Sequence, residues 1–392
     1  MPTKTPQSKI PKLRFPSFSG GWEEKKLGDV FVKIRNGFVG IATPFYVHNG
    51  VPYLQGKNIK DGQIIDDGLI YVSKIFHEKQ KNSQLKEGDL LMVQSGHVGE
   101  CAVVDHQFVN GNCHAILVMT PKKEAINSNF IKNIFYSKIG LKIITKITTG
   151  NTIQHVLASD IGKIKTNIPS LLEQQKIAEF LGATDEWIEN LHTQKESFES
   201  YKKGMMQKIF SQEIRFKDDN GKNFPRWEEK KFLDVFKTIS TKNYQIKNSG
   251  ILASGKYKVV DQSKDLIAGF SNDDTKLLKG KSFIVFGDHT GILKYIDFDF
   301  VVGADGTKIL EARDKDNLKF LYYSLQANPI NTEGYKRHYS ILKDREILTP
   351  SILEQQKIAE FLTSVDKVIE AKQQQITYAE QWKKGLMQGL FV

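Results

Sequence analysis

Residues 170–210 read SLLEQQKIAEFLGATDEWIENLHTQKESFESYKKGMMQKIF, and residues 351–391 read SILEQQKIAEFLTSVDKVIEAKQQQITYAEQWKKGLMQGLF. The two segments align without a gap, and about half of their positions are identical, which is the signature of an internal repeat. Because only two copies of a large unit are present, the repeat predicts a pseudo-two-fold molecule rather than a solenoid.

Both repeated segments are predicted to be long helices. Each follows a proline and begins with Ser-x-x-Glu, the pattern of a capping box, at Ser170 and again at Ser351. Apolar residues then recur at spacings of three and four, as in a coiled-coil seam. Polar positions such as Lys202 interrupt this stripe, so two amphipathic helices packed on separate cores stay an alternative. The predicted inter-helix seam consists of Ile177, Leu181, Ile188, Ile358, Leu362 and Ile369.

A shorter repeat precedes each variable region. Leu-Arg-Phe at residues 13–15 leads to Trp-Glu-Glu-Lys-Lys at 22–26, and Ile-Arg-Phe at 214–216 leads to the same pentapeptide at 227–231. The predicted fold is therefore α+β, with two mixed α/β domains separated by two long antiparallel helices. The predicted boundaries are 1–168 and 211–349 for the domains, and 169–210 and 350–392 for the helices.

The composition favours a polyanionic partner. The 392 residues carry a net charge of +11, and a basic excess of this size suits contacts with phosphate, although compositional drift explains it equally well. Two cysteines are too few for a disulfide framework or a closed zinc site. The absence of a long apolar run and of a secretory signal pattern leads us to expect a cytoplasmic protein.

Within the variable regions, strand-like runs at 89–93, 115–119, 282–286 and 298–302 alternate with turns, while 130–144 and 318–325 are predicted to be helical. Polar loops follow the strand-like runs and precede the long helices. Small residues let a backbone approach phosphate, and amide or imidazole groups can reach base edges, although each residue alone fits an ordinary turn. The candidate DNA-binding residues of the first region are Gln94, Ser95, His97, Asn151, Thr152, Gln154 and His155, with Arg35, Lys57 and Asn58 as phosphate anchors. Those of the second region are Asp288, His289, Thr290, Tyr335, Lys336, Arg337 and His338.

The doubled Pro-Ser-[Leu/Ile]-Leu-Glu-Gln-Gln-Lys-Ile-Ala motif, the Trp-Glu-Glu lead-ins and the Lys-Lys-Gly-x-Met-Gln helix ends give the chain a specific resemblance. Over its whole length it resembles the specificity subunit of type I restriction–modification systems. The resemblance implies two target recognition domains, each reading one half of a split site in double-stranded DNA. It also implies that the helices dock two methyltransferase subunits, that restriction–translocase subunits complete the complex, and that adenine methylation or cleavage is the partners' work.

No catalytic centre is legible in the sequence. Asn328-Pro329 is followed by Ile330, which does not fit an adenine methyltransferase motif, and no glycine fingerprint precedes it. The spacing Gly250-x4-Gly255-Lys256 places Tyr257 where a phosphate-binding loop needs Ser or Thr. We therefore expect a non-enzymatic chain without a metal or cofactor of its own, and we expect S-adenosylmethionine, ATP and Mg²⁺ in partner subunits. The alternative function is a coiled-coil scaffold that displays two protein-binding domains.

Overall fold

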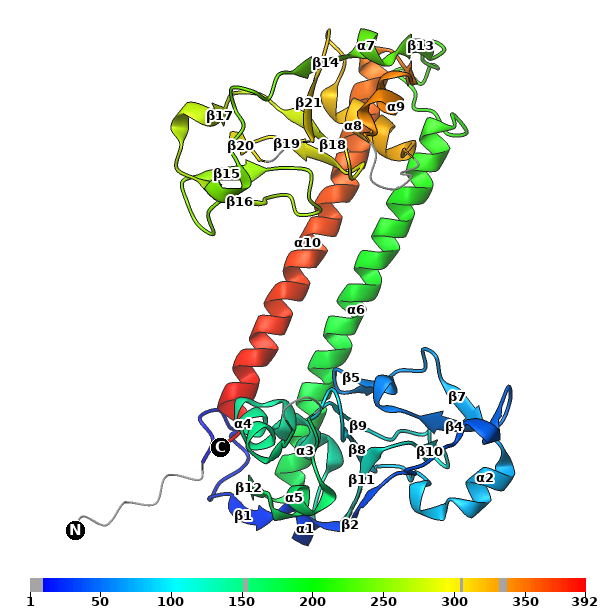
Figure 1. The fold of residues 1–392 in the computed structure, drawn as a ribbon, viewed down its shortest axis with the longest axis vertical. Coiled ribbons are helices and arrows are strands. Elements are labelled where there is room, and N and C mark those ends of the chain that lie inside the picture. The colour runs from blue at the N-terminus through cyan, green and yellow to red at the C-terminus, as the bar shows by residue number, and fades with distance from the viewer. Residues whose placement is uncertain (1–9, 151–153, 304–305, 331–336) are drawn as a thin grey trace, which may run out of the picture. The chain divides into compact units, whose positions relative to one another are not determined.

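The computed structural model describes residues 10–150, 154–303, 306–330 and 337–392. The chain forms two compact units, Met1–Leu191 with Gln375–Val392, and His192–Gln374. The long helices α6 (Leu171–Phe210) and α10 (Ile352–Leu390) each contribute residues to both units (Figure 1). None of the helices in the described part of the chain has the length and apolar character that a membrane span requires.

The first unit contains an antiparallel sheet in the order β2-β11-β8-β9. Its strands are β2 (Phe31–Asn36), β11 (Ile116–Pro121), β8 (Leu90–Val93) and β9 (Cys101–Val103). A second sheet, in the order β10-β4-β7-β3, consists of β10 (Asn112–Cys113), β4 (Val51–Leu54), β7 (Ile70–Val72) and β3 (Tyr46–Val47). Two short pairs complete the strands: β1 (Glu23–Lys26) with β12 (Lys165–Ile168), and β5 (Ile59–Lys60) with β6 (Gln63–Ile64).

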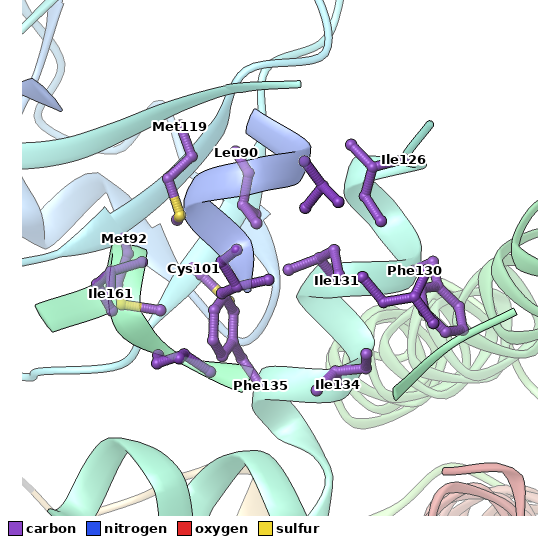
Figure 2. Close-up of a cluster of buried hydrophobic side chains, with 14 of the residues drawn as sticks. Leu90, Met92, Cys101, Met119, Ile126, Phe130, Ile131, Ile134, Phe135 and Ile161 are labelled. Atoms are coloured by element: carbon purple, nitrogen blue, oxygen red, sulfur yellow. The ribbon is translucent and has the colours of Figure 1, made fainter. Parts of the chain in front are cut away.

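Four helices of the first unit pack on the first sheet: α1 (Leu27–Val30), α3 (Ser128–Tyr136), α4 (Lys138–Ile147) and α5 (Ala158–Lys163). A fifth helix, α2 (Lys74–Lys79), packs on the second sheet through Phe76. Figure 2 shows the core, where Ile131 and Phe135 of α3 lie beside Cys101 of β9. The single helix predicted at 130–144 is wrong, because Ser137 separates α3 from α4. The Ser137 hydroxyl accepts a hydrogen bond from the amide of Gly140 and so caps α4.

The second unit repeats this plan. Its antiparallel sheet, in the order β14-β21-β18-β19, consists of β14 (Phe236–Ile239), β21 (Thr307–Ala312), β18 (Phe283–Gly287) and β19 (Leu293–Ile296). Its second sheet, in the order β16-β15-β20-β17, consists of β16 (Gly269–Ser271), β15 (Tyr257–Val260), β20 (Phe300–Val302) and β17 (Leu277–Leu278). The pair β13 (Glu228–Lys231) and β22 (Glu346–Thr349) and the helices α7 (Phe232–Val235), α8 (Leu318–Ala327) and α9 (Tyr339–Lys343) complete it.

Inside each unit, α6 and α10 run antiparallel. In the first unit Phe180 packs against Trp382 with ring centroids 6.0 Å apart, and Leu191 packs against Ile376, so residue numbers rise on one helix as they fall on the other. In the second unit Tyr201 packs against Phe361 at 6.4 Å, which is the same contact made by the repeat-equivalent positions. The predicted α+β fold class, with its internal repeat and paired long helices, is confirmed.

The residues predicted as the seam divide into two groups. Ile177 and Leu181 are fully buried in the core of the first unit, together with Phe130 of α3 and Met387 of α10. Ile358 and Leu362 have the same place in the core of the second unit. Ile188 packs in a smaller cluster made only by the two helices, with Leu191, Ile376 and Ala379, and Ile369 is half-buried. The apolar stripe therefore serves mainly to seat the helices on the domains.

The Glu-Gln pair in each helix motif bonds the helix to its domain. Glu173 accepts two hydrogen bonds from Arg14, at 2.8 and 2.7 Å, and Glu354 accepts the equivalent pair from Arg215. The expected capping box is only half formed, since Ser170 caps the amide of Glu173 at 3.4 Å while the Glu173 carboxylate turns to Arg14. A buried carboxylate gains more from a bidentate guanidinium than from one backbone amide, which explains the difference.

Gln174 and Gln355 link each helix motif to the first turn of a domain helix. The Gln174 side chain accepts from the amide of Asn127, the N-cap of α3, at 2.9 Å and donates to the carbonyl of Pro169 at 3.0 Å. Gln355 makes the same bonds to Asn317, the N-cap of α8, and to Pro350. Both glutamines are completely buried, so these bonds fix the orientation of each domain on its helix.

Candidate nucleic-acid interface

Strand register gathers several polar loops at one edge of the first unit. Asn36, at the end of β2, pairs with Leu117, and Val93, at the end of β8, pairs with Ile116. Leu54, at the end of β4, pairs in parallel with Cys113, which lies just before β11. The loops that follow β2, β4 and β8 therefore all lie beside the start of β11.

The structure brings together the two candidate loops of the first unit. Ser95 forms a β-bridge with His155, and the amide of Val156 donates to the carbonyl of Gln94 at 3.1 Å. His97, Gln154 and His155 are exposed. The candidates Asn151 and Thr152 lie outside the described residues.

Gln94 is half-buried, and its side-chain oxygen Oε1 has no hydrogen-bond partner among the described residues. This oxygen is itself buried, so the Gln94 side chain must turn outward before the oxygen can accept a hydrogen bond from an external donor.

The three residues predicted as phosphate anchors differ in accessibility. Lys57 is exposed and donates to the carbonyl of Gly68 at 2.8 Å. Asn58 is completely buried, where it accepts from the amide of Gln55 at 3.0 Å and donates to the carbonyl of Ile65 at 3.0 Å. Asn58 therefore shapes the loop that carries Lys57.

Arg35 is directed into the first unit. Its guanidinium pairs with the fully buried Asp89 at 3.2 Å and donates to the Thr120 hydroxyl at 2.6 Å. These bonds join β2 to β11 and to the residue just before β8. Arg35 therefore supports the loops from below and does not present its guanidinium at their surface.

The second unit assembles its candidate loops in the same way. Gly287, at the end of β18, pairs with Thr307, at the start of β21. The Asp288 amide donates to the carbonyl of Gly306 at 2.7 Å, and the Asp288 carboxylate accepts from the amide of Tyr339 at 2.8 Å. The loop after β18 and the segment that leads into α9 are thus held side by side.

Within this cluster, Asp288 and His338 are 3% and 1% exposed, so both organise the loops from inside. Nδ1 of the His338 imidazole lies 3.0 Å from the carbonyl oxygen of Asp288. Thr290 and Arg337 are exposed and His289 is half-buried, while Tyr335 and Lys336 lie outside the described residues.

Two glutamines at the edge were missed by sequence reasoning. Gln55 directly follows β4, and Gln262 follows the equivalent strand β15. Gln262 accepts from the amide of His289 at 3.2 Å through Oε1 and from the Thr290 hydroxyl at 2.8 Å through its carbonyl. The signal that could have found them is a buried run followed by Gln-x-Lys, at residues 55–57 and 262–264.

Close packing fixes the shape of the second edge. Gly306 has φ +86°, and a Cβ there would lie 2.8 Å from both Gln262 and His289, so the site requires glycine. Behind the loop, the ammonium of Lys294 donates to the carbonyls of Asp261, at 2.8 Å, and Asp265. Burial lowers the pKa of Lys294, and the neighbouring carboxylates of Asp261 and Asp265 act in the opposite direction.

Comparison with known proteins places this architecture in a family. The family model for the type I restriction modification DNA specificity domain matches residues 19–200 and 225–381. The chain is 25% identical over 409 aligned residues to the type I restriction enzyme MjaVIII specificity subunit of Methanocaldococcus jannaschii, covering 96% of this chain and 92% of that protein. It is also 25% identical to the putative type I restriction enzyme MjaX specificity subunit of the same organism, covering 93% and 92%.

Solved structures share the fold. The S subunit of the type I restriction–modification system from M. genitalium superposes with a TM-score of 0.63 at 17% identity, covering 97% of this chain and 99% of that one. A chain from a structural study of type I R-M complex assembly and conformational transition gives a TM-score of 0.56 at 15% identity, covering 94% and 97%. Since the family model matches twice and accounts for most of the sequence, the chain belongs to the family of type I restriction modification DNA specificity proteins.

Proposed function

We propose that this chain is the DNA sequence-recognition subunit of a type I restriction–modification complex. Each unit would read one half of a bipartite target, and partner subunits would carry out adenine methylation or restriction. The observation that carries the proposal is an arrangement found in both units. In the first unit, the loop after β8 bonds to the segment before α5, and in the second unit the loop after β18 bonds to the start of α9.

The exposed residues of each edge suit contacts with DNA. In the first unit, the side chains of His97 and Gln154 can donate to or accept from base edges in the major groove. In the second unit, Arg337 offers a guanidinium that can bond guanine in a bidentate way. Lys57 is available for a phosphate, and the net charge of +11 favours DNA through counterion release.

The long helices carry equivalent exposed apolar residues in the two units, which supports two copies of one protein partner. Leu172 and Leu353 occupy the same repeat position and are 71% and 65% exposed. Tyr201 and Trp382 form a second equivalent pair, at 49% and 48%. Large apolar side chains exposed at matching positions are typical of protein interfaces. We propose that two methyltransferase subunits dock here, in the cytoplasm, and that restriction–translocase subunits join them.

In this arrangement the chain itself is not an enzyme. S-adenosylmethionine would bind the methyltransferase subunits, and ATP with Mg²⁺ would bind the restriction subunits.

Reconstitution tests the proposal. The purified chain is expected to methylate no DNA alone, and to create site-specific adenine methylation when it is mixed with its cognate methyltransferase subunit. Sequencing of the methylated DNA should reveal a split motif. Methylation by the chain alone would overturn the division of labour. A stable complex without sequence preference would favour a protein scaffold instead.

A further inference from the structure

A short loop of the first unit exposes two aliphatic side chains beside the polar loops. Val39 and Ile41 are 69% and 80% exposed, whereas Ala42 is 2% exposed. Between β2 and these residues, Phe38 packs against Phe76 with ring centroids 5.0 Å apart. The exposed residues 39–41 therefore lie between two anchored residues, Phe38 and Ala42.

The backbone of this loop is firmly held. The amides of Gly37 and Phe38 donate to the carbonyls of Ile116 and Cys113 at 2.7 and 2.9 Å, and Ala115 donates to Phe38 at 2.9 Å. A Cβ at Gly37 would lie 2.6 Å from Sγ of Cys113, so no larger residue fits there. These bonds fix the start of the loop, and the restricted χ1 rotation of Val and Ile limits the positions that the two side chains can take.

The loop occupies the proposed DNA-reading edge. It begins after Asn36, which pairs with Leu117, while Gln94 follows Val93, which pairs with Ile116. The two loops therefore flank the start of β11 on opposite sides, in the sheet where Figure 1 shows β2, β11 and β8.

The second unit provides a contrast at the same place. The segment after β14 exposes Lys242 and Asn243 instead of aliphatic side chains. The apolar character of residues 39–41 is thus a property of one recognition surface and not of the shared frame.

We propose that Val39 and Ile41 contact thymine 5-methyl groups in the major groove of the half-site read by the first unit. The inference rests on the proposed function. The thymine methyl is the apolar mark that the major groove displays, and apolar side chains recognise it directly. Two rigid aliphatic groups beside hydrogen-bonding loops supply the apolar part of a readout whose polar part comes from residues such as Gln154.

Deoxyuridine substitution tests this contact, because deoxyuridine pairs like thymidine but lacks the methyl group. The complex of the chain with its methyltransferase subunit is measured on duplexes in which each thymine of the first half-site is replaced in turn. We expect the wild-type complex to lose about fourfold in affinity at a contacted thymine, because the free energy of burying one methyl-sized group is lost. The double variant Val39→Ser/Ile41→Ser is expected to bind the two duplexes equally.

Matched variants separate this role from others. Val32 is 65% exposed near the opposite end of β2, so Val32→Ser should keep the wild-type sensitivity to deoxyuridine. The exchange Val39→Ile/Ile41→Val, which preserves apolar character, should keep it as well. Thermal melting of each variant is the check that its fold is intact.

Several outcomes would overturn the inference. One is that deoxyuridine leaves the affinity of the wild-type complex unchanged throughout the first half-site. Another is that the double variant loses as much affinity on deoxyuridine as the wild-type complex does. Loss of methyltransferase binding by the double variant would assign the loop to a protein contact instead. If the double variant no longer unstacked a base that the wild-type complex unstacks, as measured by 2-aminopurine fluorescence, the loop would be a wedge between bases instead. Failure of the wild-type complex to prefer any sequence would refute the proposed function itself, which is a separate result.

Discussion

Lys202 on α6 pairs with Asp366 on α10 at 2.6 Å, and the repeat forms the same ion pair in the first unit between Lys383 and Asp185. Asp366 also accepts a hydrogen bond from the Tyr323 hydroxyl of α8 at 2.6 Å. One carboxylate thus bonds both the neighbouring long helix and the recognition domain. The sequence showed Lys202 only as a polar position that interrupts the apolar stripe, whereas in the structure its side chain is 17% exposed and joins the two helices.

The variant Asp366→Asn is expected to lower the free energy of unfolding of the second unit by about 2 kcal/mol, since it weakens two hydrogen bonds to a charged group. Chemical denaturation measures the change. Glu196→Gln, at an exposed position of α6 in the same unit, is the control and should have no effect. Equal stability of the two variants would contradict the role given to this carboxylate.

Glu173→Gln is expected to destabilise the first unit by about 3 kcal/mol, because it leaves the guanidinium of Arg14 without its buried partner. Glu354→Gln should act similarly on the second unit through Arg215. The first variant should cost more, since Trp22 also donates to Glu173, at 3.3 Å. Thermal melting of both variants and of the wild type shows which variant loses more stability. A larger loss for Glu354→Gln than for Glu173→Gln would be inconsistent with these contacts.

Each unit should control only its own half-site. Gln154→Ala is expected to relax recognition in one half of the motif, and Arg337→Ala in the other, with a cost on the order of 1–3 kcal/mol for a lost base contact. Methylome sequencing of both variants gives the readout. Lys57→Ala should weaken all sites alike, because a phosphate carries no sequence information. Relaxation of both halves by one substitution would argue against independent units.

His338→Ala should behave as a stability variant. The imidazole is 1% exposed and contacts the carbonyl of Asp288, so its removal is expected to cost about 1–3 kcal/mol and to loosen the loop that carries Arg337. Melting temperature should fall for His338→Ala and stay unchanged for Arg337→Ala. If His338→Ala kept the wild-type melting temperature and lost only DNA binding, the inward orientation of His338 would be refuted.

The repeat and the long helices could be predicted because their evidence is local. Near-identity over residues 170–210 and 351–391, with apolar spacing and a preceding proline, needs no knowledge of distant contacts. The break at Ser137 escaped prediction for the opposite reason. Serine is tolerated inside helices, and only the bond from the Gly140 amide makes Ser137 a cap.

The candidate interface was predicted as loops but not residue by residue. A polar side chain after a strand can face solvent or turn inward, and its partners decide which. Asn58 and Asp288 turn inward because the amides of Gln55 and Tyr339 need acceptors. The partner of Asp288 lies 51 residues away along the chain, so the sequence alone gives no sign of it.

The glutamine at the start of each long helix sets a rule for exchange between proteins. Gln174 and Gln355 each accept from the amide of an asparagine that begins a domain helix, and each donates to the proline just before the long helix. The two variable regions share little other sequence, yet both make this contact, next to the Arg14–Glu173 and Arg215–Glu354 pairs. A foreign domain transplanted into either position must therefore bring a helix whose N-cap amide reaches that glutamine, while its exposed polar loops are free to diverge. New target specificities can then arise by cassette replacement, without any redesign of the helices.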